Sequence, residues 1–445
     1  MAVLPHHYQP LQSGSPHAEE RGIDSGRRAV LSSLKRASLQ PVALLPPPPC
    51  SLVHKQQQPK AIVSIPPSAN PSPPTLPHPE RFRFIDGLRG IASLGVACYH
   101  ITRYGPVAGS ARLALPASLQ FLCDHAWVGV QVFFVISGFV IAYSVRSARV
   151  TPGYLANYAF RRSLRLDPPY WTTIALVLLL HLLMTQFGGV TSLLDVPSPL
   201  NPPLSPALVG AHLLYLHKIL GYDSLSAGFW TLCIEFQFYL AYVATLGVVQ
   251  WLTRLTPRLP GWCWPGSIFG SAAVASLVWW NLDRGYENLV LYFFCLFFLG
   301  IAAFWSVSNQ APHWIFWLYA GLVLARLLAT NAFQGFAESL ELKAALACGV
   351  SIVLLGRAGL LATALDWPWL QYLGRISYSL YLIHFPVAHV VTNLAELALG
   401  SPLSPPVAAM ILGVALLTSL LAAHGLYLLV EAPSVRLANR FRRPD

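Results

Sequence analysis

Long apolar runs, separated by short polar segments, dominate this chain from about residue 84 onward. A transmembrane helix needs ~20 apolar residues, and eleven stretches reach or approach that length: 88–106, 126–146, 170–187, 207–220, 228–250, 266–281, 288–308, 313–330, 342–362, 370–398 and 405–431. Charged residues make up only 11% of the sequence, whereas soluble domains carry about 25%. The runs therefore exclude a soluble globular fold and indicate an integral membrane protein. Because the first run comes after residue 85, we expect no ordinary cleavable signal peptide.

Arginines between the apolar runs indicate how the helices are oriented. Five of them lie between two early runs: Arg146, Arg149, Arg161, Arg162 and Arg165. Cytoplasmic loops are rich in Lys and Arg, so we expect this segment and both flanks of the apolar region to be cytoplasmic. Two cytoplasmic ends require an even number of spans. The short run 207–220 contains two histidines and a lysine, and we interpret it as re-entrant or interfacial. The sequence thus predicts an all-α polytopic membrane protein, a bundle of about ten transmembrane helices with both termini cytoplasmic, in the cytoplasmic or plasma membrane.

Residues 1–79 differ in composition from the rest of the chain. They are rich in Pro, Ser and Gln and lack hydrophobic periodicity, so we expect a disordered tail, followed by a transmembrane domain over 80–440. The net charge of +11 lies largely in the tails and one loop, which indicates membrane orientation rather than nucleic-acid binding. The seven cysteines are scattered, so we expect buried thiols and no metal site.

The first apolar run carries an arginine and a histidine. Arg89 and His100 are eleven residues apart, which is almost three whole turns of a helix, so both side chains share one face, roughly 16 Å apart along the axis. Ionisable residues inside a membrane are costly and are candidate functional residues. The alternative is a snorkelling arginine at the membrane boundary and a histidine that hydrogen-bonds to a neighbouring helix.

A single carboxylate, Glu235, lies in the apolar segment "GFWTLCIEFQFYLAY". A buried carboxylate without a partner is protonated or expensive to keep charged. Pairing with a histidine on another span would satisfy it, and would orient the imidazole and stabilise its protonated form. A neutral glutamic acid bridging two helices is the alternative.

Two further polar groups accompany the apolar runs. Arg161, Arg162 and Arg165 lie in "FRRSLRLDPPYW" (160–171), which we expect to be a cytoplasmic loop with a Pro-Pro turn beside Tyr170. Arginine suits phosphate recognition, although such a cluster also serves as a topology signal. In "LGRISYSLYLIHFPV" (373–387), Tyr378, Tyr381 and His384 follow at helical spacings of three on one face. Packing explains that pattern as readily as chemistry does.

These segments, in this order, resemble acyltransferase family 3, the integral membrane O-acyltransferases of the O-antigen, exopolysaccharide and nodulation-factor type. The resemblance covers roughly residues 82–440 and rests on "FIDGLRGIASLGVACYH", "WVGVQVFFVISGFVIA", "RRSLRLDPPYW", "FWTLCIEFQFYL" and "LGRISYSLYLIHFPV". Three positions depart from the family pattern. Gln131 stands where many members have Asp, Phe236 replaces a second Glu, and Asp167 replaces an aromatic or apolar residue before the proline.

The resemblance implies roles for particular residues. His100 would correspond to the catalytic histidine and Glu235 to its acidic assistant. The residues expected to bind substrate are Arg89, Arg161, Arg162, Arg165, Asp86, Tyr170, Trp230, Tyr381 and His384. The arginines would hold an acyl-CoA donor, by default acetyl-CoA, from the cytoplasmic side, and no bound cofactor is expected.

The implied reaction transfers an acyl group to a hydroxyl of an extracytoplasmic or lipid-linked carbohydrate. His100 would act as general base, which contributes about 10²–10⁴-fold in rate, or would form a covalent acyl-histidine intermediate. Two other functions remain open from the sequence alone. One is a proton-coupled transporter that uses the same polar groups as a relay. The other is a non-catalytic subunit of an envelope-polymer export system.

Overall fold

The computed structural model describes residues 82–186, 204–333 and 339–441, so the predicted disordered tail lies outside the described residues. The longer elements in these ranges are all α-helices: α1 (Arg83–Arg103), α2 (Ala108–Arg112), α3 (Ala117–His125), α4 (Gly129–Ser144), α5 (Pro152–Gln186), α6 (Pro206–Leu213), α7 (Phe229–Leu255), α8 (Cys263–Val278), α9 (Val290–Ser308), α10 (Trp314–Phe333), α11 (Leu340–Arg357), α12 (Pro368–Leu399), α13 (Pro405–Leu426) and α14 (Ala432–Arg440). A five-residue π-helical turn, η4 (Tyr427–Glu431), joins α13 to α14. The all-α prediction is confirmed for the described residues.

Each of the ten predicted spans overlaps one of the long helices α1, α4, α5 and α7–α13. Six helical stretches are long and apolar enough to cross a membrane: Ala117–Ser144, Pro152–Leu183, Phe229–Leu255, Val290–Ser308, Pro368–Leu399 and Pro405–Arg440. The count of ten spans and the cytoplasmic placement of the termini stay predictions. The eight-residue helix α6 is only about 12 Å long, which agrees with interpreting 207–220 as a segment that does not span.

The loop predicted for 160–171 is wrong. Helix α5 runs without interruption from Pro152 to Gln186 and contains Pro168 and Pro169 in its interior. Each proline removes one backbone N–H donor, and side chains of α5 and of neighbouring segments form hydrogen bonds beside the two prolines. The Asp167 carboxylate accepts hydrogen bonds from Ser163 and from the hydroxyl of Tyr215, and the hydroxyl of Tyr378 donates to the carbonyl of Leu166 at 2.9 Å. The arginines therefore lie on a helix rather than in a mobile loop.

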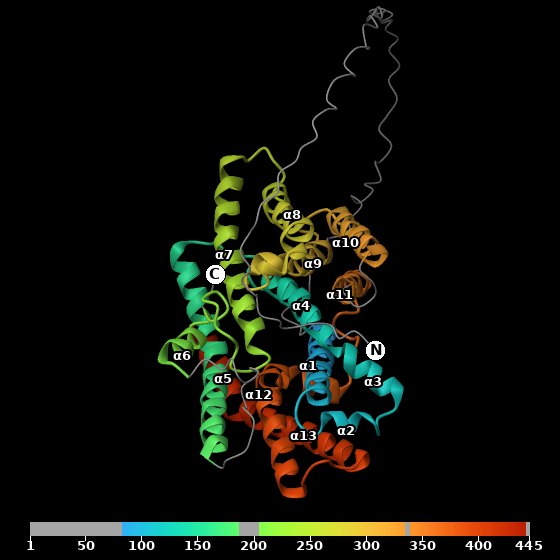
Figure 1. The fold of residues 1–445 in the computed structure, drawn as a ribbon. Coiled ribbons are helices and arrows are strands. Elements are labelled where there is room, and N and C mark those ends of the chain that lie inside the picture. The colour runs from blue at the N-terminus through green and yellow to red at the C-terminus, as the bar shows by residue number, and fades with distance from the viewer. Residues whose placement is uncertain (1–81, 187–203, 334–338, 442–445) are drawn as a thin grey trace, which may run out of the picture. The chain divides into compact units, whose positions relative to one another are not determined.

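Helices α1 and α12, far apart in the sequence, lie side by side (Figure 1), and contacts at both ends show that they run in the same direction. At their starts, Arg83 forms an ion pair with Asp366, just before α12. Near the end of α1, His100 contacts His384 in the middle of α12. Glycine permits the close approach, because a Cβ at Gly374 would lie 2.2 Å from the backbone oxygen of Asp86.

Helices α4 and α9 form a second parallel pair. The Phe134 ring contacts Phe293 with centroids 4.9 Å apart, and one helical turn or more later Phe139 contacts Phe304 at 5.6 Å. A Cβ at Gly300 would lie 1.8 Å from the backbone oxygen of Val135. This pair belongs to a large apolar core that also includes residues of α7, α8, α10 and α11.

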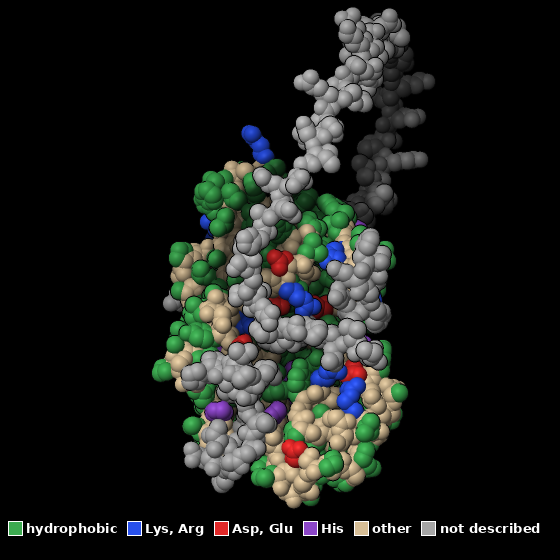
Figure 2. All heavy atoms as spheres, viewed as in Figure 1, with side chains coloured by type: hydrophobic (Ala, Val, Ile, Leu, Met, Phe, Trp, Pro, Cys, Tyr) green, Lys and Arg blue, Asp and Glu red, His purple; other side chains and the backbone are tan. Residues whose placement is uncertain are grey.

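The outer surface of the described helices is largely apolar. Leu421 and Leu429 near the end of the chain are 63% and 79% exposed, and Trp279 after α8 is 69% exposed. Figure 2 shows one face, on which hydrophobic side chains cover much of the flanks and several acidic and basic side chains gather near the middle. Such a surface suits contact with lipid rather than water.

Candidate active site

A cavity of about 80 Å³ lies among α1, α4, α5, α7, α12 and η4. Its lining contains three arginines and two carboxylates: Arg89, Arg162, Arg165, Glu235 and Glu431. With all five ionised, the lining carries one net positive charge. The sequence predicted four of these residues as site residues, and the structure brings those four together around one space.

Glu235 is held by polar side chains around the cavity. Its Oε1 accepts a 2.5 Å hydrogen bond from the Ser137 hydroxyl on α4 and another from the Tyr239 hydroxyl, one turn further along α7. The guanidinium of Arg162 lies 3.8 Å from the same oxygen and packs over the Tyr239 ring, with its carbon 3.6 Å from the ring centroid. Glu235 and Arg162 thus form a long ion pair, in which each charge partly neutralises the other.

Arg89 and Arg165 differ from Arg162 in their surroundings. Within the described ranges, neither side chain takes part in a hydrogen bond or an ion pair with another described residue, although both line the cavity. Glu431 faces both guanidinium groups across the cavity, beyond ion-pair distance. Two half-buried guanidinium groups without direct protein partners are suited to bind an anion. Arg161 is not part of the lining, and its Nε is buried without a partner among the described residues.

Glu431 is a site residue that the sequence analysis missed. Its side chain is 8% exposed, and its Oε2 accepts hydrogen bonds from the backbone N–H of Ser379 at 3.2 Å and from the Ser379 hydroxyl at 2.6 Å. The π-helical turn η4 brings this residue to the cavity, and π-turns are frequent at functional sites. The available signal was a lone carboxylate near the end of the last apolar run.

His100 lies outside this cavity and has a histidine as its partner. Its Nδ1 is 2.8 Å from Nε2 of His384, and the two rings are stacked with centroids 5.1 Å apart. The Nδ1 of His384 is 2.9 Å from the carbonyl oxygen of Leu380. A second, small cavity of about 10 Å³ lies next to His100 and is also lined by Tyr104 and His389.

The expected contact between Glu235 and His100 does not occur among the described residues. Glu235 lines the first cavity and His100 the second. Tyr381 and His384 connect the two places, because they lie one turn apart on α12. The Tyr381 hydroxyl lines the first cavity and is 2.7 Å from the Thr231 hydroxyl of α7, whereas His384 reaches His100.

The remaining predicted residues lie around the site rather than in it. Tyr170 is fully buried, stacked on Tyr215, and its hydroxyl has no partner among the described residues. Trp230 packs against Phe134 with centroids 6.4 Å apart. Asp86 and Trp230 are not among the residues that line either cavity. The structure therefore places Tyr170 and Trp230 in aromatic contacts, and the roles predicted for all three residues stay predictions.

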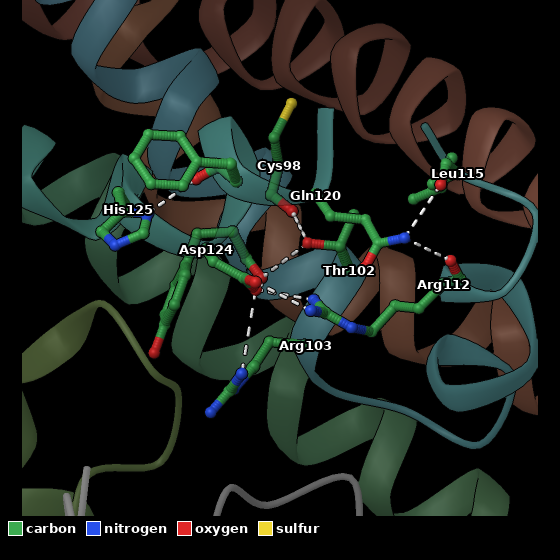
Figure 3. A network of polar contacts seen from close by, with 10 residues as sticks. Cys98, Thr102, Arg103, Arg112, Leu115, Gln120, Asp124 and His125 are labelled. Atoms are coloured by element: carbon green, nitrogen blue, oxygen red, sulfur yellow. Dashed lines mark hydrogen bonds and ion pairs between the residues drawn. The ribbon is translucent and has the colours of Figure 1, made fainter. Parts of the chain in front are cut away.

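A polar network holds the segment beyond the His100 end of α1 (Figure 3). Arg112 of α2 donates two hydrogen bonds, of 2.6 and 2.7 Å, to the two carboxylate oxygens of Asp124 on α3. Arg103, in the last turn of α1, lies 3.7 Å from the same carboxylate. The Asp124 carboxylate raises the pKa of the Arg112 guanidinium, mainly through these hydrogen bonds. The bidentate pair joins α2 to α3 and fixes both beside the end of α1.

Comparison with known proteins identifies the family. The family model described as "Acyltransferase domain" matches residues 82–424, which is most of the chain and includes every residue that lines the two cavities except Glu431. The chain belongs to this acyltransferase family. The acyltransferase is therefore an enzyme that transfers acyl groups and an integral, multi-pass membrane protein, so the sequence-based recognition is confirmed.

The sequence of this acyltransferase is similar to those of three named proteins from different bacteria. "Acyltransferase MdmB" of Streptomyces mycarofaciens is 26% identical over 83% of the chain and 95% of its own length. The Bacillus subtilis (strain 168) protein named "Putative peptidoglycan O-acetyltransferase YrhL" is 24% identical over 72% of the chain and 50% of its own length. "Nodulation protein 10" of Rhizobium leguminosarum bv. viciae is 25% identical over 63% of the chain and 82% of its own length. No solved structure gives a significant match.

Proposed function

We propose that this acyltransferase takes an acyl group, by default acetyl, from cytoplasmic acyl-CoA and transfers it to a hydroxyl of an extracytoplasmic or lipid-linked carbohydrate. The names of two relatives, which refer to peptidoglycan O-acetylation and to nodulation, support a carbohydrate acceptor. One observation carries the donor assignment: Arg89 and Arg165 line a cavity without direct ion-pair partners among the described residues. Leaving charged groups there without a counter-ion costs free energy, and the phosphates of acyl-CoA would supply that counter-ion.

The geometry of α1 gives the donor a direction. Arg89 lines the cavity, and His100 lies eleven residues further along the same helix, about 16 Å away along the axis. A donor with its phosphates at the arginines and its thin pantetheine arm directed along α1 would bring its thioester toward His100.

His100 is the proposed general base. As the acceptor oxygen attacks the thioester carbonyl, the imidazole removes the hydroxyl proton. The new C–O bond forms, the C–S bond breaks, and the imidazolium returns the proton to the departing thiolate, so that an ester and CoA–SH are released. Because Glu235 is paired with Arg162 rather than with His100, we assign it to holding that arginine in the donor site.

The experiment compares membranes containing equal amounts of the wild type, His100→Ala and, as a matched control, His313→Ala in the exposed turn before α10. Radiolabel from acetyl-CoA is followed into lipid-linked and polysaccharide fractions. Loss of a general base costs about 10²–10⁴-fold, so labelling should fall by at least 10²-fold in His100→Ala and stay unchanged in His313→Ala. Equal labelling in wild type and His100→Ala would contradict histidine-based transfer.

A further inference from the structure

We infer that His384 is a positioning residue that selects the tautomer of His100, an inference that rests on the proposed function. The observation behind it is an unbroken series of hydrogen bonds. It runs from the carbonyl of Leu380 to Nδ1 of His384 at 2.9 Å, and from Nε2 of His384 to Nδ1 of His100 at 2.8 Å. His384 is fully buried.

The Leu380 carbonyl determines the proton positions along this series. A carbonyl oxygen only accepts hydrogen bonds, so Nδ1 of His384 must carry a proton. In a neutral imidazole the other nitrogen is then an acceptor, which leaves Nε2 of His384 ready to accept from His100. Nδ1 of His100 must therefore carry its proton, and the lone pair of His100 is left on Nε2. That nitrogen is the one free to remove a proton from a substrate hydroxyl.

The opposite tautomer of His100 would not work as a base. With its proton on Nε2, His100 would present a donor to the acceptor hydroxyl, and its Nδ1 lone pair would face the Nε2 lone pair of His384. A neighbour that enforces the tautomer of a catalytic histidine is worth about 10⁴-fold in the Ser-His-Asp hydrolases. A neutral histidine stabilises the imidazolium less than a carboxylate does, so we expect about 10²-fold or more here.

Packing around His384 keeps this geometry fixed. The close approach of α1 and α12 at Gly90 and Gly374 brings the two rings within reach, since a Cβ at Gly90 would lie 2.9 Å from the backbone nitrogen of Gly374. On the other side of α12, the fully buried hydroxyl of Ser419 donates to the backbone oxygen of His384 at 3.2 Å. The histidine is thus held by its own helix, by α1 and by α13.

Two substitutions of His384 by amide side chains of different length distinguish a positioning role from a packing role. His384→Gln places its amide oxygen near the original Nε2 and can still accept from His100. His384→Asn places its amide near the original Nδ1, where it can reach Leu380 but not His100. We expect kcat for acetyl transfer from acetyl-CoA to stay within about tenfold of wild type in His384→Gln and to fall about 10²-fold in His384→Asn, with KM for acetyl-CoA unchanged in both.

The double variant His100→Ala/His384→Asn completes the test. A residue that acts through His100 has no effect once His100 is gone, so the double variant should have the residual rate of His100→Ala. Equal kcat values for His384→Gln and His384→Asn, or a further loss in the double variant, would overturn the inference. Wild-type activity in His100→Ala would instead overturn the proposed function. Thermal unfolding of each purified variant in detergent establishes that the protein is folded.

Discussion

The three arginines of the first cavity differ in how their charges are compensated. Arg162 has the Glu235 carboxylate within 3.8 Å and the Tyr239 ring beneath it. Arg89 and Arg165 have no comparable partner among the described residues, and Glu431 is engaged by Ser379. A ligand anion therefore gains most from Arg89 and Arg165, whereas Arg162 must leave a partner before it can bind strongly.

Removing one of the unpaired charges should weaken donor binding. A hydrogen bond to a charged group contributes about 1.5–3 kcal/mol, so Arg165→Gln should raise KM for acetyl-CoA about ten- to hundredfold, with a small effect on kcat. Arg149→Gln is the control, because it removes the same charge from an exposed position outside the cavity. The measurement is the rate of acetyl transfer against acetyl-CoA concentration, and indistinguishable KM values for the two variants would contradict an anion site at Arg165.

The residues of one helix could be predicted together, but contacts between helices could not. The spacing of Arg89 and His100 identified a shared face of α1. Nothing local specifies which of the other helices packs on that face, so the sequence analysis paired His100 with Glu235 instead of His384, which lies 284 residues away. Glu431 was missed for the same reason, since its partner Ser379 lies on another helix.

At the scale of single elements, the clearest difference between prediction and structure is α5. The Pro-Pro pair at 168–169 and the cluster of arginines are typical of a loop, and both belong to a continuous helix. Partners from other parts of the chain form hydrogen bonds with this helix beside the prolines. The hydroxyls of Tyr215 and Tyr378 reach α5 from outside it, and no pattern within 160–171 reports their presence. As a result Arg162 and Arg165 lie on a helix that lines the cavity.

The α4–α9 contact gives a prediction for the stability of the fold. A Cβ at Gly300 would lie 1.8 Å from the Val135 oxygen and 2.7 Å from the Phe139 nitrogen. Both atoms are backbone, so the helices themselves must move apart, and we expect Gly300→Ala to cost at least about 2–3 kcal/mol. Gly413→Ala on α13 is the control, because a Cβ there meets nothing within 4 Å and alanine favours helix by about 1 kcal/mol.

The measurement is thermal unfolding of the two purified variants in the same detergent. Gly300→Ala should unfold at a clearly lower temperature than the wild type, whereas Gly413→Ala should match or exceed the wild type. Equal midpoints for Gly300→Ala and Gly413→Ala would show that α4 and α9 are not in backbone contact in the folded protein.

At the scale of the whole molecule, helix directions bear on the number of spans. Helix α4 runs parallel to α9, and it also runs parallel to α7, since Phe134 faces Trp230 while Ser137 contacts Glu235. Two parallel spans must be separated by an odd number of intervening spans. Among the described residues, α8 is the one α-helix between α7 and α9, so we expect α8 to cross the membrane although it has only 16 residues. The parallel helices α1 and α12 correspond to predicted spans one and nine. The seven predicted spans between them are again an odd number.

Chemical labelling of the turn after α7 therefore distinguishes ten spans from six. With ten spans and a cytoplasmic C-terminus, Gly261 in the exposed α7–α8 turn is cytoplasmic and Ser401 in the exposed α12–α13 turn is external. If only the six longest apolar stretches crossed, α8 would not, and Gly261 would be external as well. A membrane-impermeant maleimide polymer applied to intact cells should shift the mobility of Ser401→Cys but not of Gly261→Cys, which should react only after permeabilisation. The wild-type chain is the control, because it shows how far the native cysteines react. Labelling of both variants in intact cells would contradict the ten-span topology.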